Sequence, residues 1–158
     1  MGHSLGGTIS MLAAIYNPHI EAFVAIMSPP VLTAARAINK TTERWKQNGV
    51  RVALRDMEQG SSDKKRFELP YSFLEDARKH NAVSGLSKLN KPKLFIFGDE
   101  DESVEPEMVI EAYNVSLDPK ELFDIHCDHN YREHPGLITQ VNDRVGKFID
   151  DYNLGKAL

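Results

Sequence analysis

The chain opens with a serine framed by glycines directly in front of an apolar helix, and this feature constrains its local fold most strongly. Residues 2–7 read Gly-His-Ser-Leu-Gly-Gly, so Ser4 lies in a G-x-S-x-G pattern. Flanking glycines let the backbone turn sharply between a strand and a helix, which leaves the serine hydroxyl exposed at the end of a sheet. Residues 6–16 predict the helix, which Pro18 ends. No strand is visible ahead of the turn, so we expect the N-terminal strands to be absent.

Three short segments indicate strands. Those at residues 22–27 and 93–98 are continuously apolar, as in strands buried on both faces, whereas the one at 121–126 alternates, which predicts one wetter face. Helices are predicted at 106–115, with a proline in the first turn, and at 135–152, where apolar residues recur every three or four positions. Alternating strands and helices predict an α/β fold with parallel pairing and right-handed crossovers. About three parallel strands are few for a stable sheet, which again suggests that strands are missing.

The segment from about residue 30 to 90 interrupts this alternation and predicts a lid-like helical insertion. A helix is expected over 33–47, and the capping box at 72–75 predicts the start of another. The basic residues 64–66 are interpreted as part of a solvated loop. Four aromatic side chains form either the core of this insertion, which we favour, or an acyl-binding pocket: Trp45, Phe67, Tyr71 and Phe73.

Composition excludes several classes of protein. Hydrophobic residues make up 41% of the 158 residues and charged residues 27%, as in globular proteins. The net charge of -4 gives no reason to expect nucleic acid or an anionic membrane as a partner. Cys127 is the only cysteine, so no internal disulfide can form. No membrane span or signal peptide is recognisable. We therefore expect a cytoplasmic location by default, although a targeting segment could have been lost upstream.

Acidic and histidine residues follow two of the predicted strands. Asp99-Glu100-Asp101-Glu102 follows the strand at 93–98, and His126-Cys127-Asp128-His129-Asn130 follows the strand at 121–126. The carboxyl ends of parallel strands share one edge of a sheet, where sites are built. A serine hydroxyl is a weak nucleophile that needs a base, and the base needs an acid to orient it. Either Asp99 or Asp101 lies close enough to the strand end to be that acid.

Other readings of the histidines are less favoured. His3 is next to Ser4, but adjacent residues on a sharp turn point apart, so we expect it to pack or to hydrogen-bond rather than to act as the base. A metal cluster is not expected, because alternation at the strand end sends His126 and His129 to different sides and no known ligand spacing is present. Cys127 is expected to pack as a small apolar residue.

These motifs resemble those of the α/β-hydrolase family, and the chain resembles the C-terminal part of such a domain. The similarity is greatest to small serine esterases and to the dienelactone-hydrolase-like and serine-aminopeptidase-like branches. Residues 2–7 match the nucleophile elbow. Residues 97–101 match the strand end in which glycine is followed by two residues and the catalytic aspartate, which implies Asp101. Residues 128–131 match the segment of the catalytic histidine, which implies His129.

The resemblance implies one truncated domain over residues 1–158 that hydrolyses a small-molecule carboxylic ester without cofactor or metal. Ser4 would be the nucleophile, His129 the base, Asp101 the orienting acid and the Leu5 N–H an oxyanion donor. An amidase or aminopeptidase, a thioesterase and a non-catalytic binding module of the same fold remain alternatives.

Truncation would impair this activity. The second oxyanion donor comes from a loop after an early strand, which the chain does not contain, so we expect the chain made alone to be inactive or nearly so. The strand at 22–27 would present an unpaired apolar edge, through which the chain would self-associate.

Overall fold

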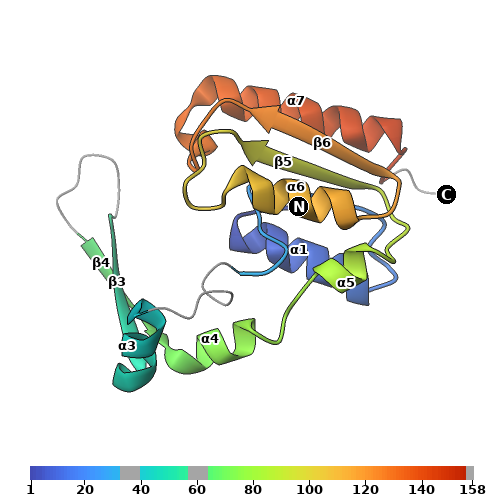
Figure 1. The fold of residues 1–158 in the computed structure, drawn as a ribbon. Helices are drawn as coiled ribbons and strands as arrows, with labels where there is room; N and C mark the ends of the chain where they lie inside the picture. The colour runs from blue at the N-terminus through green and yellow to red at the C-terminus, as the bar shows by residue number, and fades with distance from the viewer. Residues whose placement is uncertain (33–39, 57–63, 156–158) are drawn as a thin grey trace. The chain divides into compact units, whose positions relative to one another are not determined.

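The computed structural model describes residues 1–32, 40–56 and 64–155, and these fall into two compact units. The first unit combines Met1–Val31 with Asn81–Leu158, and the second is Leu32–His80 (Figure 1). The second unit lies within the segment for which the sequence predicts an insertion.

A four-stranded parallel sheet forms the centre of the first unit, in the order β1-β2-β5-β6. The strands are β1 (Gly2–His3), β2 (Phe23–Ile26), β5 (Lys93–Gly98) and β6 (Lys120–Ile125). The three predicted parallel strands are thus confirmed, and β5 has the predicted bounds. The expectation that no strand precedes the serine turn was wrong, because β1 supplies two residues that pair in parallel with Ala25 and Ile26 of β2.

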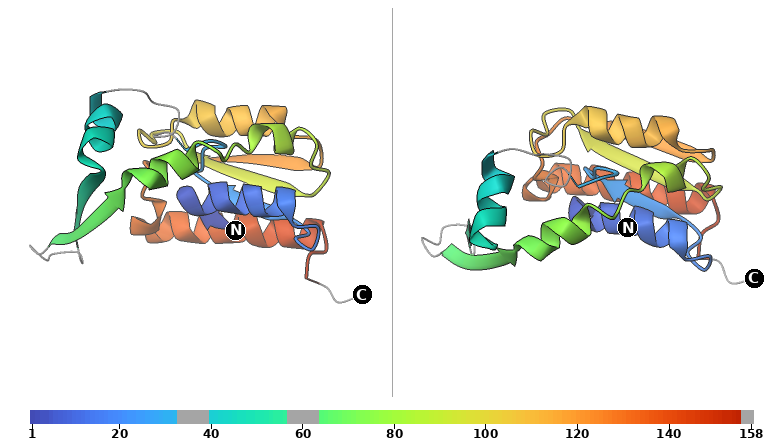
Figure 2. Two further views of the ribbon diagram at one scale, coloured as in Figure 1. Left: turned by 90° about the horizontal axis from the view of Figure 1, so that it is seen from below. Right: turned by 60° about the horizontal axis from the view of Figure 1, so that its bottom comes forward.

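Helices cover both faces of this sheet. They are α1 (Leu5–Tyr16), the short α5 (Val83–Leu86), α6 (Pro106–Val115) and α7 (Pro135–Asp151), with a 3-10 turn η1 (Tyr131–Glu133) before α7. Figure 2 shows α6 and α7 on opposite faces of the strands. Both of these helices begin at the predicted proline, whose fixed φ suits the first turn.

The core of the first unit has two layers because side chains alternate along each strand. Phe23, Ala25 and Phe95 pack on one face against α1, α5 and α6. Val24, Ile26 and their neighbours on β5 pack on the other face against the apolar stripe of α7, which comprises Val141, Val145 and Phe148. The central strands β2 and β5 are therefore buried on both sides, as continuous apolar runs in parallel strands predict, whereas β6 is mostly half-buried.

The second unit contains α3 (Lys40–Asn48), β3 (Val50–Asp56), β4 (Lys64–Pro70) and α4 (Tyr71–Ala77). The prediction of a helical insertion was wrong for residues 50–70, because β3 and β4 form an antiparallel pair in which Val50 is opposite Pro70. Val50, Val52 and Leu54 occupy alternate positions of β3, as do Phe67 and Leu69 in β4, and this partial period of two is the signal that the prediction overlooked.

Other predictions for this unit have mixed outcomes. The basic residues 64–66 lie in β4 rather than in a loop, although Lys65 and Arg66 are exposed. α4 begins at Tyr71 with no side-chain cap, so the predicted capping box at 72–75 does not form. The predicted helix at 33–47 is described only from Lys40, since 33–39 lie outside the described residues, as does the polar stretch 57–63.

Trp45 is the centre of the second unit's own packing. Its ring is stacked near Phe73 at 6.4 Å and lies edge-on to Tyr71 at 6.3 Å, and its Nε1–H donates to the Leu69 carbonyl at 2.9 Å. These contacts favour the interpretation of Trp45, Tyr71 and Phe73 as local packing. Phe67 and Phe73 are nevertheless 40% and 38% exposed, so both lie at the surface.

Among the helices of the described residues, none combines the length and the apolar character needed to cross a bilayer.

Candidate active site

Ser4 lies on the sharp turn between β1 and α1, in a backbone conformation that is rare for a residue with a side chain. Its φ is 55° and its ψ is -127°. Such a conformation costs roughly 1–3 kcal/mol and persists only where the surrounding structure enforces it. Here the Ser4 N–H donates to the Ile26 carbonyl at 2.9 Å, and the Ser4 carbonyl accepts from the Gly7 N–H at 3.0 Å. Hydrogen bonds to β2 on one side and to the first turn of α1 on the other therefore hold Ser4 in this strained conformation.

Two glycines of the motif are required by the close approach of other atoms. A Cβ on Gly2 would lie 2.2 Å from the carbonyl carbon of Gly6, and a Cβ on Gly7 would lie 1.9 Å from Oγ of Ser28. A Cβ on Gly6, in contrast, meets nothing within 4 Å. The motif therefore reflects packing of the turn at Gly2 and Gly7, which lets α1 approach the end of β2.

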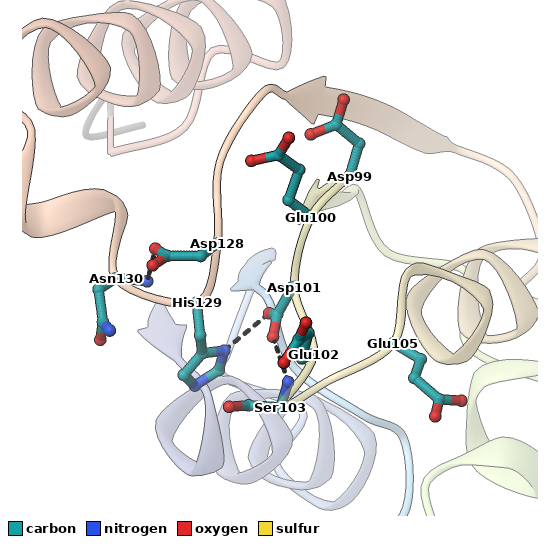
Figure 3. A pocket seen from close by; sticks show the side chains of 9 residues that line it. All are labelled: Asp99, Glu100, Asp101, Glu102, Ser103, Glu105, Asp128, His129 and Asn130. Carbon is teal, nitrogen blue, oxygen red and sulfur yellow. Dashed lines mark hydrogen bonds and ion pairs between the residues drawn. The ribbon is translucent and has the colours of Figure 1, made fainter.

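Asp101 and His129 form a hydrogen-bonded pair across the ends of β5 and β6 (Figure 3). Nδ1 of His129 lies 2.7 Å from Oδ2 of Asp101, whose side chain is only 1% exposed. The other oxygen, Oδ1, accepts the N–H groups of Ser103 and Val104, each at 2.8 Å. The carboxylate is thus fixed on both oxygens. Because a carboxylate accepts, Nδ1 carries the proton and Nε2 of the neutral ring keeps its lone pair free for a base.

The competing carboxylate, Asp99, pairs with a different histidine. Nδ1 of His126 lies 3.0 Å from Oδ2 of Asp99, and these two side chains are 77% and 49% exposed. The hydrogen bond from His126 holds the pKa of Asp99 below its usual range. The same bond, then the charges of Asp99 and Glu100, raise the pKa of His126. The sequence alone left Asp99 and Asp101 open, and the structure brings only Asp101 into contact with His129.

His3 brings the serine turn up to this pair. Its Nε2–H donates to the carbonyl of His129 at 3.0 Å, and the two rings lie 4.7 Å apart between centroids. The expectation that His3 forms a packing or hydrogen-bonding contact is confirmed. Since Ser4 follows His3 directly, the three residues predicted from the sequence are gathered at one edge of the sheet. Leu5 begins α1, and the first N–H groups of a helix have no partner within it.

A cavity of about 880 Å³ lies beside His129. Figure 3 shows that it is lined by the loops that follow β5 and β6, and its lining residues are Asp99, Glu100, Asp101, Glu102, Ser103, Glu105, Asp128, His129 and Asn130. In the part of the chain that the structure describes, no three His, Cys, Asp or Glu side chains are grouped to hold a metal ion. Cys127, as expected, is buried in the core against α7.

Met27, at the end of β2, is a feature that sequence reasoning missed. Its φ is 47°, it is fully buried, and its N–H donates to the Ile96 carbonyl at 2.7 Å. Methionine carries no signal for a left-handed conformation. The neighbouring Ser28-Pro29-Pro30 predicts that the strand ends there, but it does not predict the positive φ of Met27.

A parallel sheet covered on both faces, with a strained serine turn and a carboxylate–imidazole pair at one edge, defines the α/β-hydrolase class. A family model described as "Putative esterase" matches residues 1–107. The chain therefore belongs to this esterase family, within the α/β-hydrolase fold.

Solved structures show the same fold. The esterase domain of a Rhodothermus marinus protein is 21% identical, with a TM-score of 0.68, over 94% of this chain and 58% of its own. Mouse α/β-hydrolase domain-containing protein 10 is also 21% identical, with a TM-score of 0.72, over 96% and 61%. The monoacylglycerol lipase of Paleococcus ferrophilus is 16% identical, with a TM-score of 0.68, over 94% and 66%.

The chain thus spans 58–66% of the length of these three structures. No curated protein matches the sequence.

Proposed function

We propose that the protein is a serine hydrolase that cleaves carboxylic esters. The observation that carries this proposal is the Asp101–His129 hydrogen bond of 2.7 Å at the sheet edge that also holds the strained Ser4 turn. An imidazole oriented in this way, at the same sheet edge as a serine on a sharp turn, has the parts needed for acyl transfer to water. Membership of the esterase family supports the ester as the preferred substrate class.

In this mechanism Oγ of Ser4 attacks the ester carbonyl while Nε2 of His129 takes the hydroxyl proton. His129 then returns that proton to the departing alkoxide, and a water molecule activated by the same imidazole releases the acyl group. Asp101 holds the tautomer and stabilises the imidazolium. The Leu5 N–H, at the positive end of α1, donates to the oxyanion.

We also propose that residues 1–158 by themselves hydrolyse esters slowly or not at all. Leu5 is the one oxyanion donor that we assign in them, and losing one of two donors typically costs about 2.7–4 kcal/mol of transition-state stabilisation. Purified residues 1–158 that are monomeric and hydrolyse p-nitrophenyl acetate rapidly, in a Ser4-dependent way, would contradict this.

The test of the hydrolase proposal is covalent labelling of Ser4 by a fluorophosphonate probe, read by mass spectrometry on the full-length gene product that contains these residues. The variant Ser4→Ala should lose the label. A matched control is Ser10→Ala, because Ser10 lies on the same helix with its hydroxyl bonded to the Gly6 carbonyl, and this variant should label normally. A folded protein that the probe does not label, or equal labelling of Ser4→Ala, would refute the proposal. A panel of ester, thioester and aminoacyl-amide substrates then ranks the reaction types.

We further propose that the isolated chain self-associates through the open edge of β2. Among the described residues, β1 pairs with Ala25 and Ile26 but leaves Phe23 and Val24 without a strand on that side. An apolar cavity of about 230 Å³ lies at this edge, and its lining includes Val24 of β2 and Phe148 of α7. An unpaired apolar edge is a template for another chain. Sedimentation velocity across a range of concentrations tests this, and a monomer throughout would contradict it.

A further inference from the structure

His3 connects the strand that leads into Ser4 to the loop that carries His129. Its Nε2 lies 3.0 Å from the His129 carbonyl oxygen, across 126 positions of the chain. Its ring is tilted by 38° to the His129 ring at 4.7 Å, and the Tyr131 ring lies edge-on to it at 5.4 Å. The side chain therefore touches both the backbone and the ring of the proposed base.

The two ends of this contact differ in how firmly they are held. His3 belongs to β1, pairs with Ile26 of β2 and is followed by the Ser4 N–H that donates to the same residue. His129, in contrast, lies in the connection between β6 and η1, outside any strand or helix. A donor on the sheet thus holds a carbonyl in a loop, and loops without such anchors are the more mobile parts of a fold.

We propose that His3 is a positioning residue for His129, whose Nε2–H fixes the carbonyl and ring of His129 so that the base stays directed at Ser4. This inference rests on the proposed function. It assigns a role to the first variable position of the G-x-S-x-G motif, which tolerates many residues as far as the turn itself is concerned. Misplacement of a reacting group by 1 Å can cost about a hundredfold in rate, so the anchor has a measurable consequence.

The surroundings of His3 favour its neutral form, which donates from Nε2 in one of its two tautomers. Burial, then electrostatic interaction with His129 and Arg132, lower the pKa of His3, while the bond to the His129 carbonyl and the charge of Asp101 act in the opposite direction. Tyr131, whose own pKa is raised by burial, also lies against the ring of His3. A neutral His3 donates from Nε2 and does not repel the imidazolium that forms on His129 during turnover.

Two substitutions separate the hydrogen bond from the packing of the ring. His3→Gln keeps an N–H donor at about the reach of Nε2 but removes the ring, whereas His3→Phe keeps the ring and removes the donor. His3→Asn has a donor that is too short to reach the carbonyl. The matched control is His19→Phe, because His19 is an exposed histidine of the same unit. Circular dichroism and thermal unfolding select the variants that fold.

Two measurements are made on the full-length gene product. The first is kcat and KM on p-nitrophenyl esters, and the second is the exchange rate of the His129 Nδ1 proton by NMR, which needs no turnover. We expect His3→Phe to lower kcat about tenfold, the effect of losing one hydrogen bond, with KM within about twofold, and to speed exchange of that proton. His3→Gln should restore most of kcat and the slow exchange, and His19→Phe should match the wild type.

Unchanged kcat and unchanged proton exchange in a folded His3→Phe would overturn the inference while leaving the hydrolase proposal intact. Loss of activity in His3→Gln equal to that in His3→Phe would also overturn it, since the donor would then be irrelevant. If His3→Phe does not fold, comparing His3→Asn with His3→Gln again sets a variant whose donor cannot reach the His129 carbonyl against one whose donor can. If the wild type hydrolyses no ester, the proposed function fails, and the proton exchange rate still decides whether His3 holds His129.

Discussion

Nδ1 of His129 lies 2.7 Å from Oδ2 of Asp101, and this contact joins the loop after β6 to the loop after β5. The Asp101 side chain is 1% exposed, whereas Asp99, two residues earlier, is 49% exposed and pairs with His126. A hydrogen bond shielded from water is electrostatically stronger than one at the surface. The buried pair is therefore the one equipped to orient a base and to stabilise its charged form.

Asp101→Asn should abolish most activity, and Asp99→Asn should not. Replacing the orienting carboxylate by an amide leaves the base in the wrong tautomer, which lowers kcat by about 10⁴-fold in triads of this kind. Asp99→Asn is the matched control and should stay within about threefold, because its partner is the exposed His126. Steady-state kinetics of the full-length gene product on p-nitrophenyl esters measure both. Equal losses in the two variants would contradict the assignment of Asp101.

Gly7→Ala should destabilise the protein, whereas Gly6→Ala should not. The new methyl group at position 7 would lie 1.9 Å from Oγ of Ser28, while position 6 is open. Overpacking of this kind costs about 1–3 kcal/mol, and alanine in an open helical position gains up to about 1 kcal/mol over glycine. Urea unfolding measures both changes. The double variant Gly7→Ala/Ser28→Gly should recover part of the loss, and no recovery would show that the clash lies elsewhere.

Lys93→Met should destabilise the first unit by a few kcal/mol. Lys93 is fully buried, and its Nζ donates to the carbonyls of Leu89, Leu117 and Pro119 at 2.9, 2.7 and 3.2 Å. Methionine has a similar length but no donor, so buried acceptors are left unpaired at a cost of about 1–3 kcal/mol each. Urea unfolding at pH 7 measures the change. A Lys93→Met protein as stable as the wild type would show that water replaces the ammonium group.

Lys93 should also make stability depend on alkaline pH. Burial lowers its pKa from 10.5 to about 8, so between these values the unfolded chain holds a proton that the folded chain has lost. The free energy of unfolding of the wild type should therefore rise relative to that of Lys93→Met from pH 8 to 10, by at most about 1.4 kcal/mol per pH unit. The raised pKa of Cys127 acts with the opposite sign but is common to both proteins. A difference in the free energy of unfolding between the two proteins that stays constant from pH 8 to 10 would contradict this prediction.

Cys127 should be unreactive in the folded protein. It is buried, and burial, followed by the charge of Asp128, raises the pKa of its thiol to about 11. The thiolate is the reactive form, so modification by a thiol reagent at pH 8 should be about a hundredfold slower than in urea. Rapid stoichiometric labelling of the native protein would show that the strand end opens readily.

Much of the first unit was predictable from local patterns. The run Lys93–Gly98 is apolar without interruption, and Pro106 and Pro135 carry the backbone geometry of a helix start, so these elements were placed almost to the residue. The positions of Asp101 and His129 after strands also followed from chain order, whereas the strand that precedes Ser4 was not predicted. Each of these inferences depends on neighbours within a few residues, where side-chain chemistry and backbone preference act directly.

The second unit was predicted less well for a related reason. Its helices are short, and α4 starts at Tyr71, whose N–H donates to the Gly49 carbonyl instead of relying on a side-chain cap. A contact across 22 positions thus replaced the local signal at Ser72. The antiparallel pairing of β3 with β4 likewise gives the backbone N–H and C=O groups of each strand their hydrogen-bond partners on the other strand. These bonds stabilise the extended conformation more than the weak helical preference of each segment opposes it.

Composition and motif order were enough to indicate the α/β class, the serine turn and the candidate residues, because those properties are encoded by adjacent side chains. Other features depended on packing between distant segments. These are the pairing of each aspartate with its histidine, the left-handed turn at Met27, the three carbonyls that surround Lys93 and the bond from His3 to the His129 carbonyl. These contacts join atoms that are remote in sequence, and only the folded backbone determines how far apart they lie.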